Sequence, residues 1–306
     1  MIAWLFPGQG SQVVGMGRAL VAAHPAAARV FDEASAALGF DLGALCANGP
    51  QEQLDLTVNA QPALLTTSIA ALRAAQAAGF DALPRCVAGH SLGEFTALVA
   101  VGTLRLADAV RLVRRRGELM QAVDPEGRGG MAAVLGLDGD AVARAVDGTG
   151  VVVANDNAPG QVVVSGPKDA LTEAAAALKA AGAKRVIPLR VSSAFHSPAM
   201  RAVAPELAAA IAAVRFAEPS APVIANVDAE PHARAADFPP LLERQVWSPV
   251  RWVEVMRRAY GEGAARFVEF GAGDVLSGLA KRIVPEAGTT SVSDPATLEE
   301  ALHVLR

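Results

Sequence analysis

The sequence predicts an α/β protein: a larger body built on a mostly parallel β-sheet, with a small inserted subdomain. Short apolar segments alternate with stretches of helical periodicity, which is typical of a parallel sheet with helices on both faces. After a turn-rich segment at 124–130, the elements follow the order β-α-β-β-α-β of a ferredoxin-like subdomain. We therefore expect residues 1–126 and 195–306 to form the larger body and residues 127–194 to form the insert.

In the N-terminal part of the body, apolar runs end at glycine-rich turns and lead into helices. The expected elements are, in order, a strand at 2–6, helices at 17–37 and 63–78, a strand and turn at 85–93, and helices through Met120.

The insert and the C-terminal part of the body show the same two periodicities. In the insert we expect a strand at 131–137, a helix at 140–146, strands at 151–154 and 161–165, a helix at 168–181 and a strand at 185–191. In the body that follows we expect a helix at 200–214, a strand at 222–226, a helix at 253–260, a strand at 266–270 and a helix ending near 283.

Composition excludes several classes of protein. The 306 residues are 52% hydrophobic and 19% charged, the balance of a globular chain with a sizeable core. A net charge of −4 argues against binding to nucleic acid, which is usually accompanied by a basic excess. The two cysteines and five scattered histidines lack metal-ligand spacing, so no metal is expected. Without a signal-peptide pattern or a membrane-spanning segment, a cytoplasmic location is expected.

The pattern Gly89-His90-Ser91-Leu92-Gly93 lies between an apolar strand and the start of a helix. In this context Gly-x-Ser-x-Gly forms a sharp turn that holds the serine hydroxyl out in the open, as in the α/β-hydrolases. The two glycines suit a place where neighbouring chains leave no room for side chains. The alternative is an ordinary glycine-rich turn, but the strand-turn-helix context favours Ser91 as a nucleophile.

A serine nucleophile needs a general base, and histidine is the usual one near neutral pH. His90 abuts the serine and cannot easily turn back onto it, which leaves His24, His196, His232 and His303. His196 lies in a Ser/Pro loop where the two predicted domains meet, and clefts form at such junctions. Position alone favours His196 without excluding a histidine satisfied by loop hydrogen bonds.

Two glycine pairs, Gly8/Gly10 and Gly271/Gly273, imitate part of a dinucleotide-binding loop. Neither has the third glycine in register, and the first also lacks the distant acidic partner of that motif. The glycines of the first pair let the backbone come close to a ligand, and the second pair is better explained as a packing turn.

Seven sequence blocks, in order along nearly the whole chain, resemble the malonyl-CoA:acyl-carrier-protein transacylase family. They are FPGQGSQ at 6–12, GHSLGE at 89–94, LVRRRGELM at 112–120, ANDNAPGQVVVSG at 154–166, SAFHSP at 193–198, QVWSPVRW at 245–252 and EFGAGDVLSGLAKRI at 269–283. The GHSLGE block is shared with many hydrolases; the ordered set of seven is specific.

The resemblance implies a role for each matching residue. Ser91 would be the acylated nucleophile and His196 its base, oriented by the backbone carbonyl of Gln245 in place of a triad acid. The backbone N–H groups of Gln9 and Leu92 would form the oxyanion hole.

The resemblance also places the substrate groups. Arg116 would bind the free carboxylate of malonate, because a guanidinium offers a planar fork of donors. Arg114 and Arg115 would then be surface residues, since three consecutive helical positions point in different directions. Phe195 would favour malonyl over methylmalonyl units by filling the space of the extra methyl group, a discrimination of about 1–3 kcal/mol. The alternative for Phe195 is a core phenylalanine.

The implied activity is transfer of a malonyl group from CoA to the phosphopantetheine thiol of an acyl carrier protein through a seryl ester, in a ping-pong sequence. The expected partners are malonyl-CoA and the carrier protein, with no bound cofactor, nucleic acid or membrane. Because carrier proteins are usually acidic, a local basic patch is expected, and its candidates are Lys184, Arg185, Lys281 and Arg282.

Several other functions stay open. Within the family, the chain could be the transacylase subunit of a malonate decarboxylase or a trans-acting polyketide loader. A serine esterase or thioesterase is more remote, because it would want an acid between serine and histidine and a histidine close to the C-terminus. A non-catalytic carrier-binding subunit would have no need of Ser91, Arg116 and His196 together.

Overall fold

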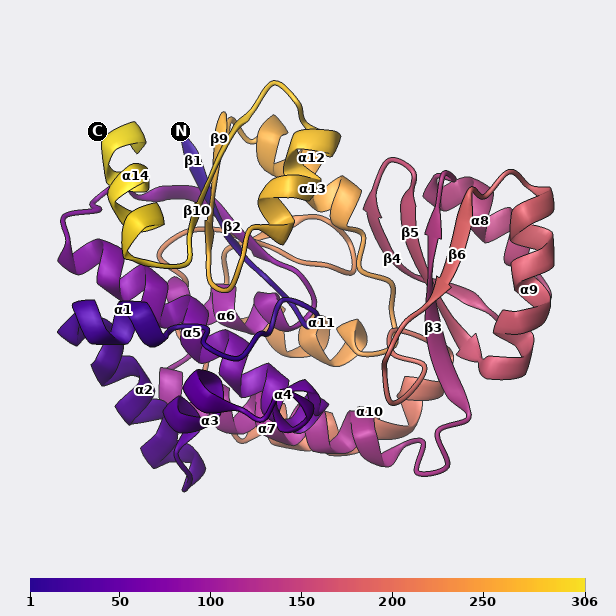
Figure 1. Ribbon diagram of the computed structural model, residues 1–306, viewed down its shortest axis with the longest axis horizontal. Helices are drawn as coiled ribbons and strands as arrows, with labels where there is room; N and C mark the ends of the chain where they lie inside the picture. The colour runs from indigo at the N-terminus through magenta and orange to yellow at the C-terminus, as the bar shows by residue number, and fades with distance from the viewer. Residues whose placement is uncertain (306) are drawn as a thin grey trace.

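The protein is described by a computed structural model that covers residues 1–305 and contains two β-sheets (Figure 1). The larger sheet has six strands in the order β10-β9-β1-β2-β7-β8, in which only β8 runs antiparallel to its neighbour. Its strands are β1 (Ile2–Phe6), β2 (Pro84–Gly89), β7 (Val223–Ile224), β8 (Pro231–His232), β9 (Arg266–Phe270) and β10 (Gly288–Val292). The expected α/β class with a mostly parallel sheet is confirmed.

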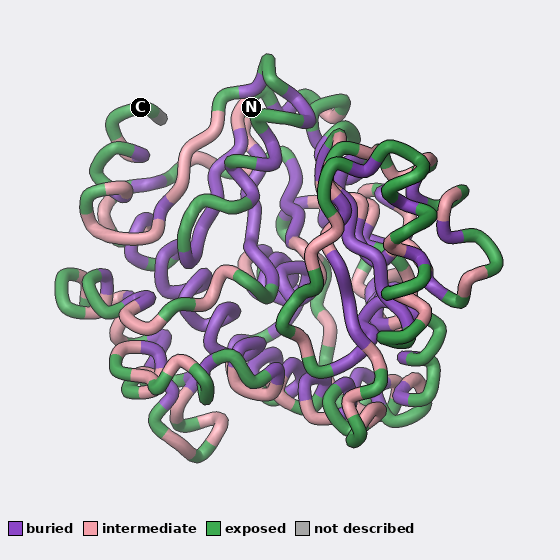
Figure 2. Tube along the Cα trace, turned by 45° about the vertical axis from the view of Figure 1, so that its right-hand side comes forward, coloured by how far each residue is buried: buried purple, intermediate pink, exposed green. Residues whose placement is uncertain are grey.

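Helices cover both faces of the six-stranded sheet, and β1 shows why. Trp4 and Phe6 pack into one apolar cluster with helix α5, whereas Ala3 and Leu5 pack into a second cluster with α12 and α13. Alternate residues of a strand point to opposite faces, so a strand that is apolar throughout needs cover on both sides. Figure 2 shows the result as buried strands through the middle of the molecule and exposed segments around them.

The remaining helices extend these two layers and the connections between them. The α-helices outside the smaller sheet are α1 (Arg18–Ala23), α2 (Pro25–Leu38), α3 (Leu42–Asn48), α4 (Gln51–Asp55), α5 (Thr57–Ala77), α6 (Leu92–Ala100), α7 (Leu106–Ala122), α10 (Ala204–Ala212), α11 (Phe238–Gln245), α12 (Trp252–Gly261), α13 (Val275–Ile283) and α14 (Pro295–Leu305). Short 3₁₀ helices lie at Pro198–Val203 and Ala235–Asp237. None of these elements within residues 1–305 is long and apolar enough to cross a bilayer.

The second sheet has four strands in the order β4-β5-β3-β6, and all neighbours in it are antiparallel. Its elements are β3 (Gly129–Leu135), α8 (Gly139–Val146), β4 (Val152–Ala158), β5 (Gln161–Pro167), α9 (Lys168–Ala180) and β6 (Arg185–Pro188). Helices α8 and α9 lie together on the outer side of this sheet, at the right of Figure 1. The order of elements along the chain is the expected one.

Several expected boundaries are wrong for identifiable reasons. The single helix expected at 17–37 is two helices, because Pro25 opens a new one and has no N–H to continue the first. Strand β10 and helix α14 were not expected at all. The sequence Gly-Thr-Thr-Ser-Val of β10 lies at the edge of the sheet, where a strand need not be apolar.

The glycines around Ser91 lie where chains cross at very short range. A Cβ added to Gly89 would lie 1.9 Å from the carbonyl of Gly93, and one added to Gly93 would lie 2.0 Å from the carbonyl oxygen of Phe6. These contacts lock β1, β2 and the start of α6 together. The close approach that the Gly-x-Ser-x-Gly pattern predicts is confirmed.

Replacement of Gly93 by alanine is expected to lower the free energy of unfolding by about 3 kcal/mol, because the contact with Phe6 is backbone and cannot rotate away. Urea unfolding followed by circular dichroism measures the change. Gly278→Ala is the matched control: Gly278 lies within helix α13, nothing would meet its Cβ within 4 Å, and alanine there is expected to be neutral or stabilising. Equal effects of the two substitutions would contradict the packing argument.

Candidate active site

Ser91 lies at the turn between β2 and α6 in a strained backbone conformation, with φ 50° and ψ −103°. Such a conformation costs a non-glycine residue on the order of 1–3 kcal/mol and persists only where the surroundings impose it. Here Asn226 imposes it: its Oδ1 accepts the Ser91 N–H at 2.7 Å and its Nδ2 donates to the Gly89 carbonyl at 2.8 Å. The turn is thereby clamped from both sides.

The Ser91 hydroxyl and the His196 imidazole are joined by a hydrogen bond of 2.8 Å between Oγ and Nε2, although 105 residues separate them in sequence. On the other side of the ring, Nδ1 lies 3.1 Å from the carbonyl oxygen of Gln245 and 3.1 Å from that of Ser248. A carbonyl oxygen can only accept, so Nδ1 carries the proton and Nε2 is free to accept from the serine. The pair has the geometry of a nucleophile and its base.

Burial lowers the pKa of His196 to about 3, with a further contribution from the positive charge of Arg116. The carbonyls of Gln245 and Ser248 oppose this shift because they stabilise the protonated ring. The imidazole is therefore neutral at neutral pH, which is the form that can take a proton from Ser91.

Arg116 reaches the same point from helix α7, with 2% of its surface exposed. Its Nη1 donates to Gln61 Oε1 at 2.9 Å, and its Nη2 donates to Gln245 Oε1 at 3.0 Å and to Ser91 Oγ at 3.3 Å. Burial lowers its pKa to about 10, and the negative charge of Glu94 partly opposes that shift. The guanidinium is therefore a fixed cation beside the serine oxygen.

The two preceding arginines point elsewhere, as the resemblance implies. Arg114 donates to Asn59 and to Glu118, and Arg115 forms ion pairs with Glu118 and Glu206. Arg115 is exposed and Arg114 is partly so. Of the three, Arg116 alone lies in the pocket with Ser91.

A pocket of about 280 Å³ opens in front of Ser91. Phe195 is buried and lines this pocket together with Met120 and Met131. Its role in favouring malonyl over methylmalonyl units stays a prediction. The complete lining is Gln9, Gly10, Gln12, Asp55, His90, Ser91, Leu92, Arg116, Met120, Met131, Asn155, Arg190, Val191, Phe195 and His196.

Gln9 and Leu92 both line the pocket near the serine. Leu92 is the first residue of α6, so its N–H has no partner within the helix. Within residues 1–305 no protein acceptor takes the N–H of either residue, while the Gln9 side chain is held by Thr57 at 3.1 Å. Both residues therefore line the pocket with a backbone N–H that has no acceptor within residues 1–305.

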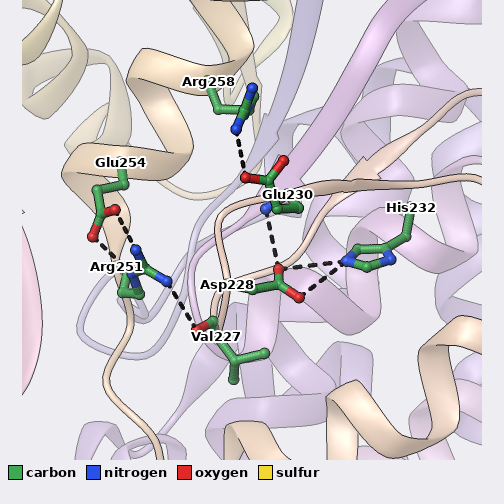
Figure 3. Close-up of polar contacts among 7 residues, drawn as sticks. All are labelled: Val227, Asp228, Glu230, His232, Arg251, Glu254 and Arg258. Carbon is green, nitrogen blue, oxygen red and sulfur yellow. Dashed lines mark hydrogen bonds and ion pairs between the residues drawn. The ribbon is translucent and has the colours of Figure 1, made fainter.

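Two other histidines, His90 and His232, have side-chain partners of their own. His90 hydrogen bonds through Nε2 to Asn157 at 2.7 Å and lies against the ring of Trp252. His232 pairs with Asp228 (Figure 3) and does not line the pocket. Among the histidines within residues 1–305, only His196 hydrogen bonds to Ser91.

Sequence reasoning missed four residues that build the site: Gln61, Glu94, Asn226 and Ser248. The first three are fully buried polar residues within or beside apolar segments, and buried polar groups need partners. That signal was available in the sequence. It indicates that each has a partner, but it does not identify the partner.

A neutral imidazole bonded to a serine hydroxyl, with free backbone donors nearby, is typical of enzymes that move acyl groups through a serine. Comparison with known proteins narrows this class. A family model described as the acyl transferase domain matches residues 3–292. The chain belongs to this family.

Individual relatives match over almost their whole length. The malonyl CoA-acyl carrier protein transacylase of Salmonella typhimurium is 46% identical over 304 residues, which cover 98% of each chain. An acyl carrier protein S-malonyltransferase from Vibrio cholerae has a TM-score of 0.95 at 43% identity, covering 98% of this chain and 99% of that one. A malonyl-transacylase solved in complex with a type II PKS acyl carrier protein has a TM-score of 0.96 at 43% identity, covering 99% of both chains.

The lowered pKa of His196 predicts an unusual pH profile. A base with the ordinary imidazole pKa of about 6.5 would lose roughly 25-fold of its neutral form between pH 7 and pH 5. Because the pKa of His196 is about 3, its neutral form persists over that range. The kcat/KM for acylation of Ser91, measured by rapid-quench mass spectrometry, is expected to change by less than about threefold between pH 7 and pH 5. An acid limb centred near pH 6.5 would contradict the burial argument.

Proposed function

We propose that the protein transfers a malonyl group from CoA to the phosphopantetheine thiol of an acyl carrier protein, through an ester on Ser91. The observation that carries the proposal is the buried Arg116 guanidinium, whose Nη2 lies 3.3 Å from the Ser91 oxygen. An acyl group bound to this serine and ending in a carboxylate would have a cation beside it. The relatives named as malonyl transacylases support the same substrate.

In the first half-reaction, Ser91 Oγ attacks the thioester carbonyl while its proton passes to His196 Nε2. The backbone N–H groups of Gln9 and Leu92 stabilise the negative charge that develops on the carbonyl oxygen. Loss of one such donor typically costs on the order of 10²–10³ in rate. The C–S bond then breaks, and the CoA thiolate leaves with the proton from His196.

In the second half-reaction, the pantetheine thiol of the carrier protein occupies the place that CoA has left. His196 takes the thiol proton, the sulfur attacks the seryl ester, and the proton returns to Ser91 Oγ as the ester bond breaks. The carbonyls of Gln245 and Ser248 stabilise the imidazolium that forms in each half-reaction. They replace the carboxylate of a catalytic triad in stabilising the imidazolium. Because they are neutral, they add no negative charge next to the malonyl carboxylate.

Two residues set substrate choice in this proposal. Arg116 recognises the malonyl carboxylate, for which Gln61 and Gln245 hold the guanidinium in place. Phe195 restricts the space next to the acyl chain and disfavours the extra methyl group of methylmalonyl units. The buried position of Phe195 on the pocket wall supports this role.

The surroundings of His196 disfavour a serine esterase with a conventional triad. Both partners of Nδ1 within residues 1–305 are backbone carbonyls and neither is a carboxylate. The proposed transfer is shared by fatty-acid synthesis, polyketide loading and malonate decarboxylation. The likeness to a transacylase bound to a type II PKS carrier protein favours a free-standing carrier protein as acceptor.

The candidate basic patch for the carrier protein lies where α13 meets the smaller sheet. Arg282 donates to the Pro159 carbonyl at 2.6 Å. In the adjoining turns, the Gly136 N–H donates to the Gly160 carbonyl at 2.9 Å. Lys184 packs against Gly136, which brings Arg282 and Lys184 to the same region. Lys281 and Arg185 are exposed neighbours in sequence of these two residues. An acidic carrier protein fits this charge.

A finer description of the architecture belongs to the same proposal. We assign residues 1–126 and 195–306 to an α/β-hydrolase-like body and residues 127–194 to a ferredoxin-like subdomain. The antiparallel order β4-β5-β3-β6 supports the second assignment, and the strand-turn-helix at Ser91 supports the first. The two cysteines, both free and buried, support a reducing, cytoplasmic location.

Intact-mass measurement after mixing with malonyl-CoA tests the proposed function. The wild-type protein is expected to gain one malonyl group and to pass it to an acyl carrier protein, whereas Ser91→Ala is expected to gain none. Arg116→Ala is expected to lose at least tenfold in acylation by malonyl-CoA and to keep or gain acylation by acetyl-CoA, because a charged hydrogen bond to the carboxylate is lost.

Arg115→Ala is the matched control, since it removes the neighbouring arginine of the same helix, which is exposed and does not line the pocket. It is expected to acylate like the wild type. Labelling of Ser91→Ala would overturn the seryl ester, and wild-type use of malonyl-CoA by Arg116→Ala would overturn the assignment of the carboxylate site.

A further inference from the structure

We propose that Glu94 is a positioning residue for this reaction. Its carboxylate hydrogen bonds to the loop that holds the Ser91 turn and to the Gln245 amide, and so keeps Arg116 facing the serine oxygen. The inference rests on the proposed function, because it concerns how the malonyl site is kept in shape. Glu94 itself does not line the pocket and has none of its surface exposed. It acts on the substrate through other residues.

One oxygen of Glu94 accepts two hydrogen bonds from two separate parts of the chain. Oε2 accepts the backbone N–H of Asn226 at 3.0 Å and the side-chain Nε2 of Gln245 at 2.8 Å. The other oxygen, Oε1, is buried and has no hydrogen-bond partner among residues 1–305. Because Glu94 lies on the first turn of α6, its carboxylate connects the helix that begins at the nucleophile to both of these segments.

The first segment is the loop after β7, which carries Asn226. As described above, the Asn226 side chain clamps the Ser91 turn. The outer side of this loop is held by the charged cluster of Figure 3, where Arg251 donates to the Val227 carbonyl at 3.5 Å and Asp228 accepts the Glu230 N–H at 3.1 Å. On the buried side of the loop, Glu94 accepts the backbone N–H of Asn226, so the loop is held on both sides.

The second segment is the end of α11, which carries Gln245. The side-chain amide of Gln245 has two possible orientations, in which its oxygen and nitrogen exchange places. Its Nε2 donates to Glu94 Oε2 and to the Ser91 carbonyl at 2.9 Å, and its Oε1 accepts from Arg116 Nη2. The Oε2 atom of Glu94 accepts both of its hydrogen bonds, and a guanidinium can only donate. Reversing the amide would place acceptor against acceptor and donor against donor, so Glu94 fixes the end of Gln245 that faces Arg116.

The same hydrogen bonds set the distance between the Glu94 carboxylate and the Arg116 guanidinium. Within residues 1–305 no carboxylate forms an ion pair with Arg116, and the negative charge of Glu94 reaches it across the Gln245 amide. A carboxylate in direct contact would compete with the malonyl group for the same donors. With the Gln245 amide between them, the two groups do not touch, and Nη2 of Arg116 stays beside the substrate site.

The test measures the ratio of kcat/KM for acylation by malonyl-CoA to that by acetyl-CoA. Glu94→Ala removes both hydrogen bonds and is expected to lower the ratio at least tenfold, since Arg116 is no longer held toward Ser91. Glu94→Gln, in contrast, is expected to keep the ratio within threefold of the wild-type value. The amide oxygen can occupy the Oε2 position and the NH₂ group the Oε1 position, where no partner is displaced.

Glu269→Ala is the matched control, because Glu269 is equally buried and its carboxylate also accepts two hydrogen bonds, here from the backbone N–H groups of Leu276 and Ser277. It lies outside the pocket and is expected to lower the melting temperature without changing the ratio. Gln245→Ala covers the case in which Glu94→Ala does not fold. It keeps the backbone carbonyl that binds His196 and is expected to lower the ratio as Glu94→Ala does.

An unchanged ratio in Glu94→Ala or in Gln245→Ala would overturn the positioning role, and so would a loss of the ratio in Glu94→Gln. These outcomes are distinct from failure of the proposed function, which would show as an absence of malonyl label on the wild-type protein itself.

Discussion

The buried guanidinium of Arg116 is the constraint on which the rest of the site depends. A cation with 2% exposure must find acceptors inside the protein, because its lost hydration is otherwise uncompensated. Gln61 and Gln245 supply those acceptors, Glu94 fixes Gln245, and Asn226 links Glu94 to the Ser91 turn. A polar network thus runs through an otherwise apolar core, and each member has a chemical reason to be there.

The parallel sheet brings this network to one place. Strands β1, β2 and β7 are parallel neighbours, and the loops after them carry Gln9, Ser91 and Asn226. Functional groups gather at the carboxyl ends of such strands, where the loops emerge from a rigid scaffold. His196 enters from a different part of the chain, beyond the smaller sheet, and its ring is aligned by carbonyls at the end of α11 and just after it. The strained backbone conformation of Ser91 persists because close-packed backbone surrounds it.

The sequence predicted those features whose cause is local. The strand at 2–6, the turn at Ser91 and the strand at 266–270 follow from short apolar runs that end at glycines, and the structure has them. The two-residue strand β7 and the polar edge strand β10 depend on neighbours that a local pattern does not contain. At the site, His196 was favoured by position, and Arg116 by resemblance to a family. The bond between Glu94 and Asn226 spans 132 residues, so no spacing in the sequence could reveal it.

The central claim is that Arg116 binds the malonyl carboxylate while Ser91 carries the acyl group. The most direct measurement is a crystal structure of the malonyl-enzyme, trapped by mixing with malonyl-CoA in the absence of a carrier protein. We expect an ester on Ser91 Oγ whose free carboxylate accepts hydrogen bonds from Arg116, with the guanidinium still held by Gln61 and Gln245. A carboxylate that points to solvent, with no contact to Arg116, would contradict the central claim.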